Sequence, residues 1–109
     1  MGRMFEYVLF ERNITPAPLE WHYTDFAWVP TNRSKVRVNV TGNMAFMVKI
    51  QWRNGESGEW VTTDEFPASM AVTRSFDRSG AQVRVGVLPM SAVPSPDTFS
   101  IRVWEVVDS

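Results

Sequence analysis

The sequence predicts an all-β protein that folds as a single antiparallel β-sandwich. Residues 36–40, 83–87 and 101–106 alternate apolar and polar side chains with a period of two, and most of the apolar ones are β-branched. Successive side chains of a strand point to opposite faces, so each stretch places a Val/Ile row on one face and an arginine on the other. That pattern is typical of an antiparallel sheet with one buried face. Apolar residues at helical spacing do not persist anywhere in the chain.

The N-terminal third of the chain predicts one strand, one connection and one extended segment. Residues 4–10 alternate and predict the first strand. Residues 13–20 contain two prolines and predict a connection. Residues 21–29 are rich in aromatic side chains and predict extended backbone, and residues 30–34 predict a turn.

Two hairpins are predicted in the middle of the chain. Residues 35–41 and 44–53 alternate, and Gly42-Asn43 between them is a dipeptide typical of hairpin turns. Asn54-Gly55 is the strongest short hairpin signal, and residues 59–63 are expected to pair back. One face of the second strand is predicted to enter the core, namely Met44, Phe46, Val48, Ile50 and Trp52.

The remaining residues predict three more strands. Pro67 predicts a loop over residues 64–69, and three prolines spread over residues 89–97 predict a second loop there. The predicted strands are residues 70–76, 81–88 and 98–107, with a turn over 77–80. Seven to nine short strands at spacings near ten residues indicate one sandwich domain that covers residues 1–109.

Composition excludes several classes of protein. The 109 residues include no cysteine, which excludes disulfide scaffolds, thiolate zinc sites and cysteine nucleophiles. The formal net charge is −1, whereas nucleic-acid binders normally carry a basic excess. An early glutamate, Glu6, interrupts any signal-peptide core, and apolar runs are too short for a membrane helix. We therefore expect no contact with nucleic acid or membrane and no export.

Candidate catalytic groups are few. His22 is the only histidine, and Asp25, three residues on, would face the opposite side of a regular strand. Four carboxylates surround one hairpin, but without a spacing typical of calcium sites or glycosidases; they are Glu56, Glu59, Asp64 and Glu65. A small hydrolase that uses Glu56 and Glu59, or His22 and Asp25, stays an alternative. The sequence predicts no enzyme, no catalytic residue, no cofactor and no metal.

Tryptophan and arginine supply the better functional signal. The chain has five tryptophans and nine arginines against two lysines, and Trp and Arg are enriched at protein interfaces. Trp104 falls beside Arg102 on the face opposite the core row, and the seven-residue spacing of Trp21 and Trp28 predicts opposite faces. A second layer that covers these rings is the alternative. The predicted partner-binding residues are Trp28, Arg102, Trp104 and, in the proline-rich loop, Met90 and Val93.

Residues 35–107 resemble fibronectin type III and other immunoglobulin-like domains. The resemblance rests on Ile50-Gln51-Trp52, on residues 80–85 and on a Pro/Ser-rich loop that leads into residues 99–103. It implies an immunoglobulin-like sandwich with Trp52 at its centre, and a jelly-roll is the other arrangement considered. The paired cysteines of those families and a corner tyrosine near Val83 are absent.

In size and character the chain also resembles small accessory proteins of bacteriophage virions, such as head decoration (cement) proteins and tail components. That resemblance implies a structural protein of the virion, made in the host cytoplasm, that binds capsid or tail proteins and forms a homo-oligomer. A carbohydrate-binding module that uses exposed tryptophans or Tyr23 is the alternative function.

Overall fold

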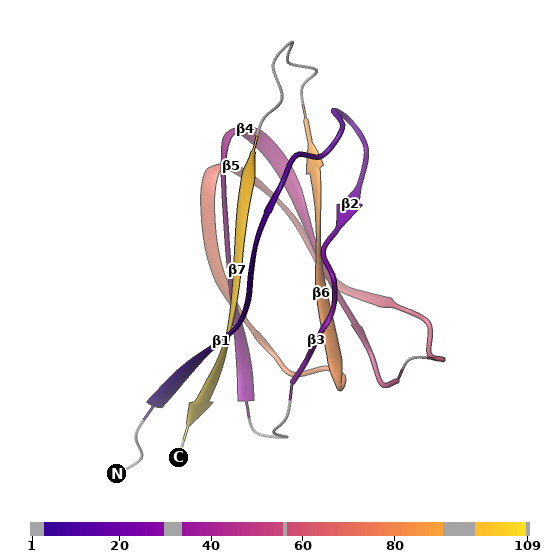
Figure 1. Cartoon of the computed structure of the whole chain (residues 1–109), viewed down its shortest axis with the longest axis vertical. Helices are drawn as coiled ribbons and strands as arrows, with labels where there is room; N and C mark the ends of the chain where they lie inside the picture. The colour runs from indigo at the N-terminus through magenta and orange to yellow at the C-terminus, as the bar shows by residue number, and fades with distance from the viewer. Residues whose placement is uncertain (1–3, 30–33, 56, 91–97, 109) are drawn as a thin grey trace.

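The computed structural model describes residues 4–29, 34–55, 57–90 and 98–108, and all of its regular elements are strands (Figure 1). The strands are β1 (Met4–Ile14), β2 (His22–Tyr23), β3 (Ala27–Trp28), β4 (Ser34–Arg53), β5 (Val61–Asp77), β6 (Gln82–Pro89) and β7 (Phe99–Asp108). All of them pair antiparallel within one sheet, so the all-β prediction is confirmed. Among these residues, no helix is long and apolar enough to cross a membrane.

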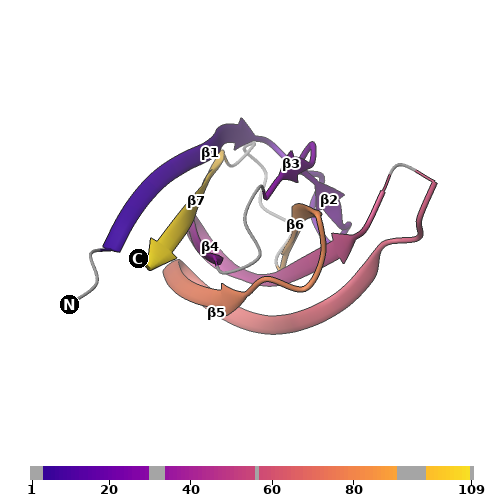
Figure 2. The same cartoon turned by 90° about the horizontal axis from the view of Figure 1, so that it is seen from below.

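The sheet is organised around the long strand β4, which changes its partner half-way. Residues 34–41 of β4 pair with β7, which in turn pairs with β1. Residues 46–53 pair with β6, which carries β2 and β3 on its other edge. Strand β5 follows the opposite edge of β4 along its whole length. Seen along the strands, the sheet curls so that its two halves enclose the core (Figure 2).

The core consists of the inward rows of both halves. Val36, Val38 and Val40 of β4 lie beside the Phe99, Ile101 and Val103 row of β7. In the other half, Val83, Val85 and Val87 of β6 pair with Trp52, Ile50 and Val48. These side chains are at most 2% exposed, and Trp52 takes the buried position predicted for it. The sandwich of two separate sheets, immunoglobulin-like or jelly-roll, is not confirmed, because the pairing gives one continuous curled sheet.

The hairpin predicted at Gly42-Asn43 is wrong. Strand β4 continues through these residues, and residues 42–44 form a bulge opposite a single residue of β5, Met70. A bulge bends the strand that contains it. The glycine is required by packing, since a Cβ atom on Gly42 would overlap the ring of Phe99.

The loop predicted over residues 64–69 is also wrong, because β5 runs unbroken from Val61 to Asp77. Pro67 is tolerated there since β5 pairs only with β4 and an edge strand has one side without ladder hydrogen bonds. Met70 takes a left-handed φ of 70° opposite the bulge. The bulge and this residue together turn the β4–β5 hairpin from one half of the sheet into the other.

The ends of the other elements differ less. Strand β1 extends four residues beyond its predicted end, to Ile14, because residues 11–14 continue the ladder with β7. The extended segment 21–29 is confirmed, but only as two short strands separated by Thr24-Asp25-Phe26. Strands β6 and β7 match their predicted ranges within about one residue.

Candidate functional site

The outer face of β4 and β6 carries three cationic side chains. Inward Val48, Ile50 and Trp52 of β4 alternate with outward residues, namely Lys49, Gln51 and Arg53. Gln51 pairs with Arg84 on β6. Because outward positions of neighbouring strands lie in register, these side chains form one band across the sheet.

Aromatic side chains of residues 21–28 lie over this band. This segment contains β2 and β3, which pair with the outer edge of β6. The rings of Trp21 and Tyr23 stack with centroids 6.2 Å apart. They cover Gly86, where a Cβ atom would lie 2.7 Å from the Tyr23 ring. An aromatic ring packed over a strand glycine replaces the missing side-chain contacts. Toward β3, the ring centroid of Phe26 lies 6.4 Å from that of Trp28 and 6.3 Å from that of Trp60.

Cations and rings alternate along the band, which we call the cation–aromatic ladder. The Lys49 ammonium lies 4.1 Å from the Trp21 ring centroid. The Arg84 guanidinium lies 4.3 Å from Tyr23 and 4.5 Å from Trp60. The Arg53 guanidinium lies 4.3 Å from Trp60 and 4.8 Å from Phe26. In order, the ladder contains Trp21, Lys49, Tyr23, Arg84, Trp60, Arg53, Phe26 and Trp28.

Arg84 is the central cation of the ladder and is half-buried. Its Nε donates a hydrogen bond of 2.7 Å to Gln51 Oε1, and Gln51 Nε2 donates to Thr62 Oγ1 over 3.1 Å. Burial lowers the pKa of Arg84, Tyr23 opposes this effect, and the nearby charge of Arg53 adds to it. Among the described residues, no carboxylate lies within ion-pair distance of Arg84. Rings and an amide, rather than an acid, hold this charge.

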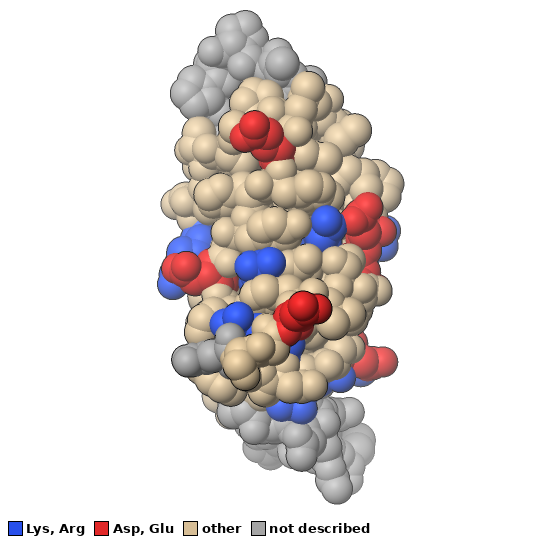
Figure 3. Space-filling model, turned by 90° about the vertical axis from the view of Figure 1, so that its right-hand side faces the viewer, with Lys and Arg blue, Asp and Glu red and all other residues tan. Residues whose placement is uncertain are grey.

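The two ends of the ladder differ in exposure. Lys49 forms an ion pair with Glu65 over 3.6 Å, and Trp21 beside it is half-buried. At the other end Trp28 is 55% exposed and Phe26 is 38% exposed. The side of the molecule that carries β2 and β6 is mostly uncharged, with both basic and acidic side chains reaching the surface at separate points (Figure 3).

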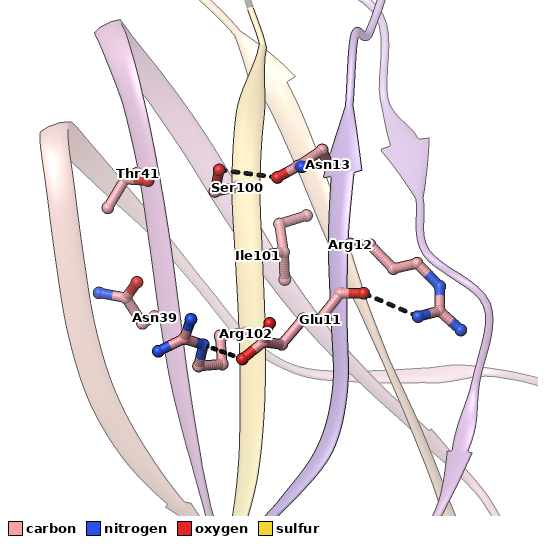
Figure 4. Close-up of a pocket in the computed structure, with 8 residues that line it drawn as sticks. All are labelled: Glu11, Arg12, Asn13, Asn39, Thr41, Ser100, Ile101 and Arg102. Carbon is pink, nitrogen blue, oxygen red and sulfur yellow. Dashed lines mark hydrogen bonds and ion pairs between the residues drawn. The ribbon is translucent and has the colours of Figure 1, made fainter.

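A second feature is a polar groove of about 480 Å³ on the outer face of β1, β7 and the first half of β4 (Figure 4). Arg102 Nε donates to Glu11 Oε1 across it over 2.5 Å. Ser100 Oγ donates to Asn13 Oδ1 over 2.8 Å. The groove is lined by Glu11, Arg12, Asn13, Asn39, Thr41, Ser100, Ile101 and Arg102.

The structure does not bring the predicted partner-binding residues together. Trp28 is exposed at the start of β6, whereas Met90, 48% exposed, follows the end of that strand, roughly 25 Å away. Arg102 and Trp104 lie on the outer face of β7, in the other half of the sheet, with the guanidinium 5.6 Å from the ring. Val93 lies outside the described residues. The described residues of this set therefore do not form a single patch, and their role in partner binding stays a prediction.

The prediction that Trp21 and Trp28 lie on opposite faces is wrong as well. Both rings belong to the ladder because the backbone between β2 and β3 is irregular, so the period of two does not continue through it. Buried Thr24 anchors that irregular segment. Its N–H donates to Val85 O over 2.9 Å, and its Oγ1 accepts from Val85 N over 3.1 Å.

Sequence reasoning missed the ladder itself. Alternation along residues 44–53 predicts that Lys49, Gln51 and Arg53 share the polar face of a strand, but it does not predict their partners on β6. The signal was present in the aromatic pairs two residues apart, Trp21/Tyr23 and Phe26/Trp28, which place two rings on one face of extended backbone. His22 and Asp25 are exposed, and within the described residues no three acidic or histidine side chains cluster as metal ligands would.

Comparison with known proteins shows the fold alone. No family model matches the chain, and no curated protein sequence matches it. The crystal structure of PirA is similar over 91% of this chain and 93% of its own, with 15% identity and a TM-score of 0.53. A structure of Bacillus endospore appendages, described as a novel family of disulfide-linked pili, is similar over 98% of this chain and 89% of its own. Its identity is 9% and its TM-score 0.55.

Proposed function

We propose that the protein is a non-enzymatic structural subunit that binds other protein subunits through the Trp28 end of the cation–aromatic ladder. The observation that carries this proposal is an exposed tryptophan, Trp28, that packs against the Phe26 ring, which in turn contacts the Arg53 guanidinium. Tryptophan and arginine dominate the binding energy of protein interfaces, and a side chain fixed before binding loses little entropy on association.

The similarity to an appendage protein supports the same reading. The Bacillus neighbour is described as part of pili, which are assemblies of subunits, and its fold has a TM-score of 0.55 with this chain. That neighbour is described as disulfide-linked, whereas this chain has no cysteine. The residues of this chain therefore cannot form a disulfide link between subunits, and the ladder end offers a noncovalent contact instead.

The specific form of this proposal is a bacteriophage virion accessory protein, either a head decoration protein or a tail component. Its support is size, the absence of cysteine and the high content of arginine and tryptophan. Capsid or tail proteins and further copies of this chain would then be the partners, and the virion would be its location.

The test compares wild type with Trp28→Ala and with Val8→Ala, a control that removes a side chain of similar exposure, 53%, from the outer face of β1. Self-association is followed by sedimentation velocity, and attachment to particles by co-sedimentation of each purified variant with a lysate of the source. We expect Trp28→Ala to lose both self-association and attachment to particles, and Val8→Ala to keep both. A wild type that stays monomeric and never pellets with large particles would overturn the proposal.

A further inference from the structure

We infer that the polar groove on the outer face of β1, β7 and β4 is a binding site for a neutral saccharide. This site is separate from the ladder, and the inference does not depend on the proposed function. It rests on the chemistry of the groove, on the fixed geometry of its side chains and on the tryptophan beside it.

The groove offers hydrogen-bond donors and acceptors around one charge-balanced pair, Arg102 and Glu11. Three rows cross the three strands, and the middle one contains Glu11, Arg102 and Asn39. Asn39 Nδ2 donates to Thr73 Oγ1 over 2.8 Å, which leaves its Oδ1 as an acceptor toward the groove. The Ser100 bond uses Asn13 Oδ1, which leaves the Asn13 amide donors. Sugar hydroxyls both donate and accept, so they match such a mixed surface.

The charged pair in the groove argues against an anionic ligand. Arg102 is neutralised by Glu11, and both side chains are about half exposed, at 50% and 52%. An ion pair at this exposure contributes little to the stability of the fold. The remaining N–H groups of Arg102 and the second carboxylate oxygen of Glu11 can therefore hydrogen-bond to a ligand with little loss of fold stability. Arg12 adds no charge to the centre, because its guanidinium turns away and donates to Glu11 O (Figure 4).

Trp104 supplies the apolar surface that saccharide recognition requires. It follows Arg102 by two residues on β7, so both point to the same outer face, and the ring is half-buried beside the guanidinium. The C–H face of a sugar packs on an aromatic ring, while its hydroxyls reach neighbouring polar groups. In the ladder, Lys49, Arg84 and Arg53 lie 4.1–4.3 Å from ring centroids. The Arg102 guanidinium lies farther from the Trp104 ring, at 5.6 Å.

All of these side chains stand on hydrogen-bonded strands rather than on loops. Strand positions hold side chains more firmly than loops do, and a preformed site loses less free energy on binding. The groove volume of about 480 Å³ lies within the range of roughly 300–1,000 Å³ typical of small-molecule sites.

The test is a glycan array that contains both neutral and acidic glycans, probed with the labelled full chain, followed by calorimetric titration with the best-bound glycan. We expect neutral glycans to bind and tryptophan fluorescence to change. Thr41→Val exchanges a groove hydroxyl for a methyl group and suits a strand, so it should fold and weaken binding roughly threefold to tenfold. Asn39→Ala should weaken it by about tenfold or more.

The matched control is Asn43→Ala, which removes an exposed asparagine amide from the same strand outside the groove and should leave the affinity unchanged. Three results would overturn the inference: binding to no glycan on the array, binding to acidic glycans alone, or a neutral-glycan affinity that Thr41→Val, Asn39→Ala and Trp104→Ala all leave intact. Loss of binding in Trp28→Ala, with these three variants unaffected, would move the site to the ladder and also count against it.

Discussion

The rings of Phe66 and Phe76 stack with centroids 5.8 Å apart, although ten residues of one strand separate them. A straight strand would place them roughly 33 Å apart. The bend of β5 therefore brings its two halves together, and Arg74 lies over the Phe66 ring at 4.1 Å. This pair closes the core at the β5 edge, where the two halves of the sheet meet.

The first prediction concerns this closure. Phe66→Ala should lower the free energy of unfolding by about 3 kcal/mol, because Phe66 is 6% exposed and its removal leaves a cavity. A double-mutant cycle with Phe76→Ala should show a coupling of about 0.5–1.5 kcal/mol. Urea unfolding measures both, with Val61→Ala (59% exposed) as the control that should change stability by less than about 0.5 kcal/mol. A coupling energy of zero would mean that stacking of the two rings contributes nothing to the stability of the fold.

The bend itself gives the second prediction. Met70 has a φ of 70°, a region that costs a non-glycine residue about 1–2 kcal/mol, and its side chain is 55% exposed. Met70→Gly should therefore stabilise the protein by about 0.5–1 kcal/mol, even though glycine gains entropy in the unfolded chain. Met70→Val should destabilise it, since a β-branched side chain fits this φ poorly. Equal thermal midpoints for the two variants would contradict the backbone geometry seen here.

Strands β6 and β7 could be predicted from the sequence because one face of each carries a row of buried Val, Ile or Phe side chains and the other face carries mostly polar or small residues. Val83, Val85 and Val87 alternate with polar or small residues, and such alternation is the direct consequence of that environment. Trp52 could be placed in the core for the same reason. The local sequence pattern is sufficient to predict a strand that has one partner on each side and contains no bulge.

The β4–β5 bend and the ladder could not be predicted because tertiary contacts decide them. Gly42 is a typical turn residue, yet here its missing side chain leaves space for the ring of Phe99 from a distant strand. Pro67 looks like a loop residue, and only the edge position of β5 makes it compatible with a strand. The ladder joins residues 21–28 to β4, Trp60 and β6, so its existence depends on a strand order that periodicity does not contain.

The role assigned to Gly42 is tested by a pair of glycine variants. Gly42→Ala should lower the free energy of unfolding by about 2 kcal/mol or more, because the new methyl group would overlap the Phe99 ring in a packed core. Gly55→Ala adds the same atom where nothing lies within 4 Å and should change stability by less than about 0.5 kcal/mol. Thermal and urea unfolding of both variants measure this difference. If Gly42 served only as a flexible turn residue, the two losses would be similar.

The glycine under the ladder gives a prediction with a spectroscopic readout. A Cβ atom on Gly86 would lie 2.7 Å from the Tyr23 ring and 3.3 Å from Trp21. Gly86→Ala should therefore shift both rings away from the sheet and separate Lys49 from Trp21. Near-ultraviolet circular dichroism and tryptophan emission should change, while far-ultraviolet spectra stay the same. Unchanged near-ultraviolet spectra would show that these rings do not rest on Gly86.

The stacking of Arg84 between Tyr23 and Trp60 is tested by Arg84→Lys, which keeps the charge and removes the planar group. A lysine cannot stack on both rings and also hold the Gln51 bond, so stability should fall by about 1–2 kcal/mol in urea unfolding. Arg12→Lys, at a guanidinium 5.8 Å from a single ring, is the control and should change little. Since neither variant alters net charge, the difference between them should persist at high salt. Equal stabilities would mean that the ladder is held by the rings alone and that the arginines merely lie beside them.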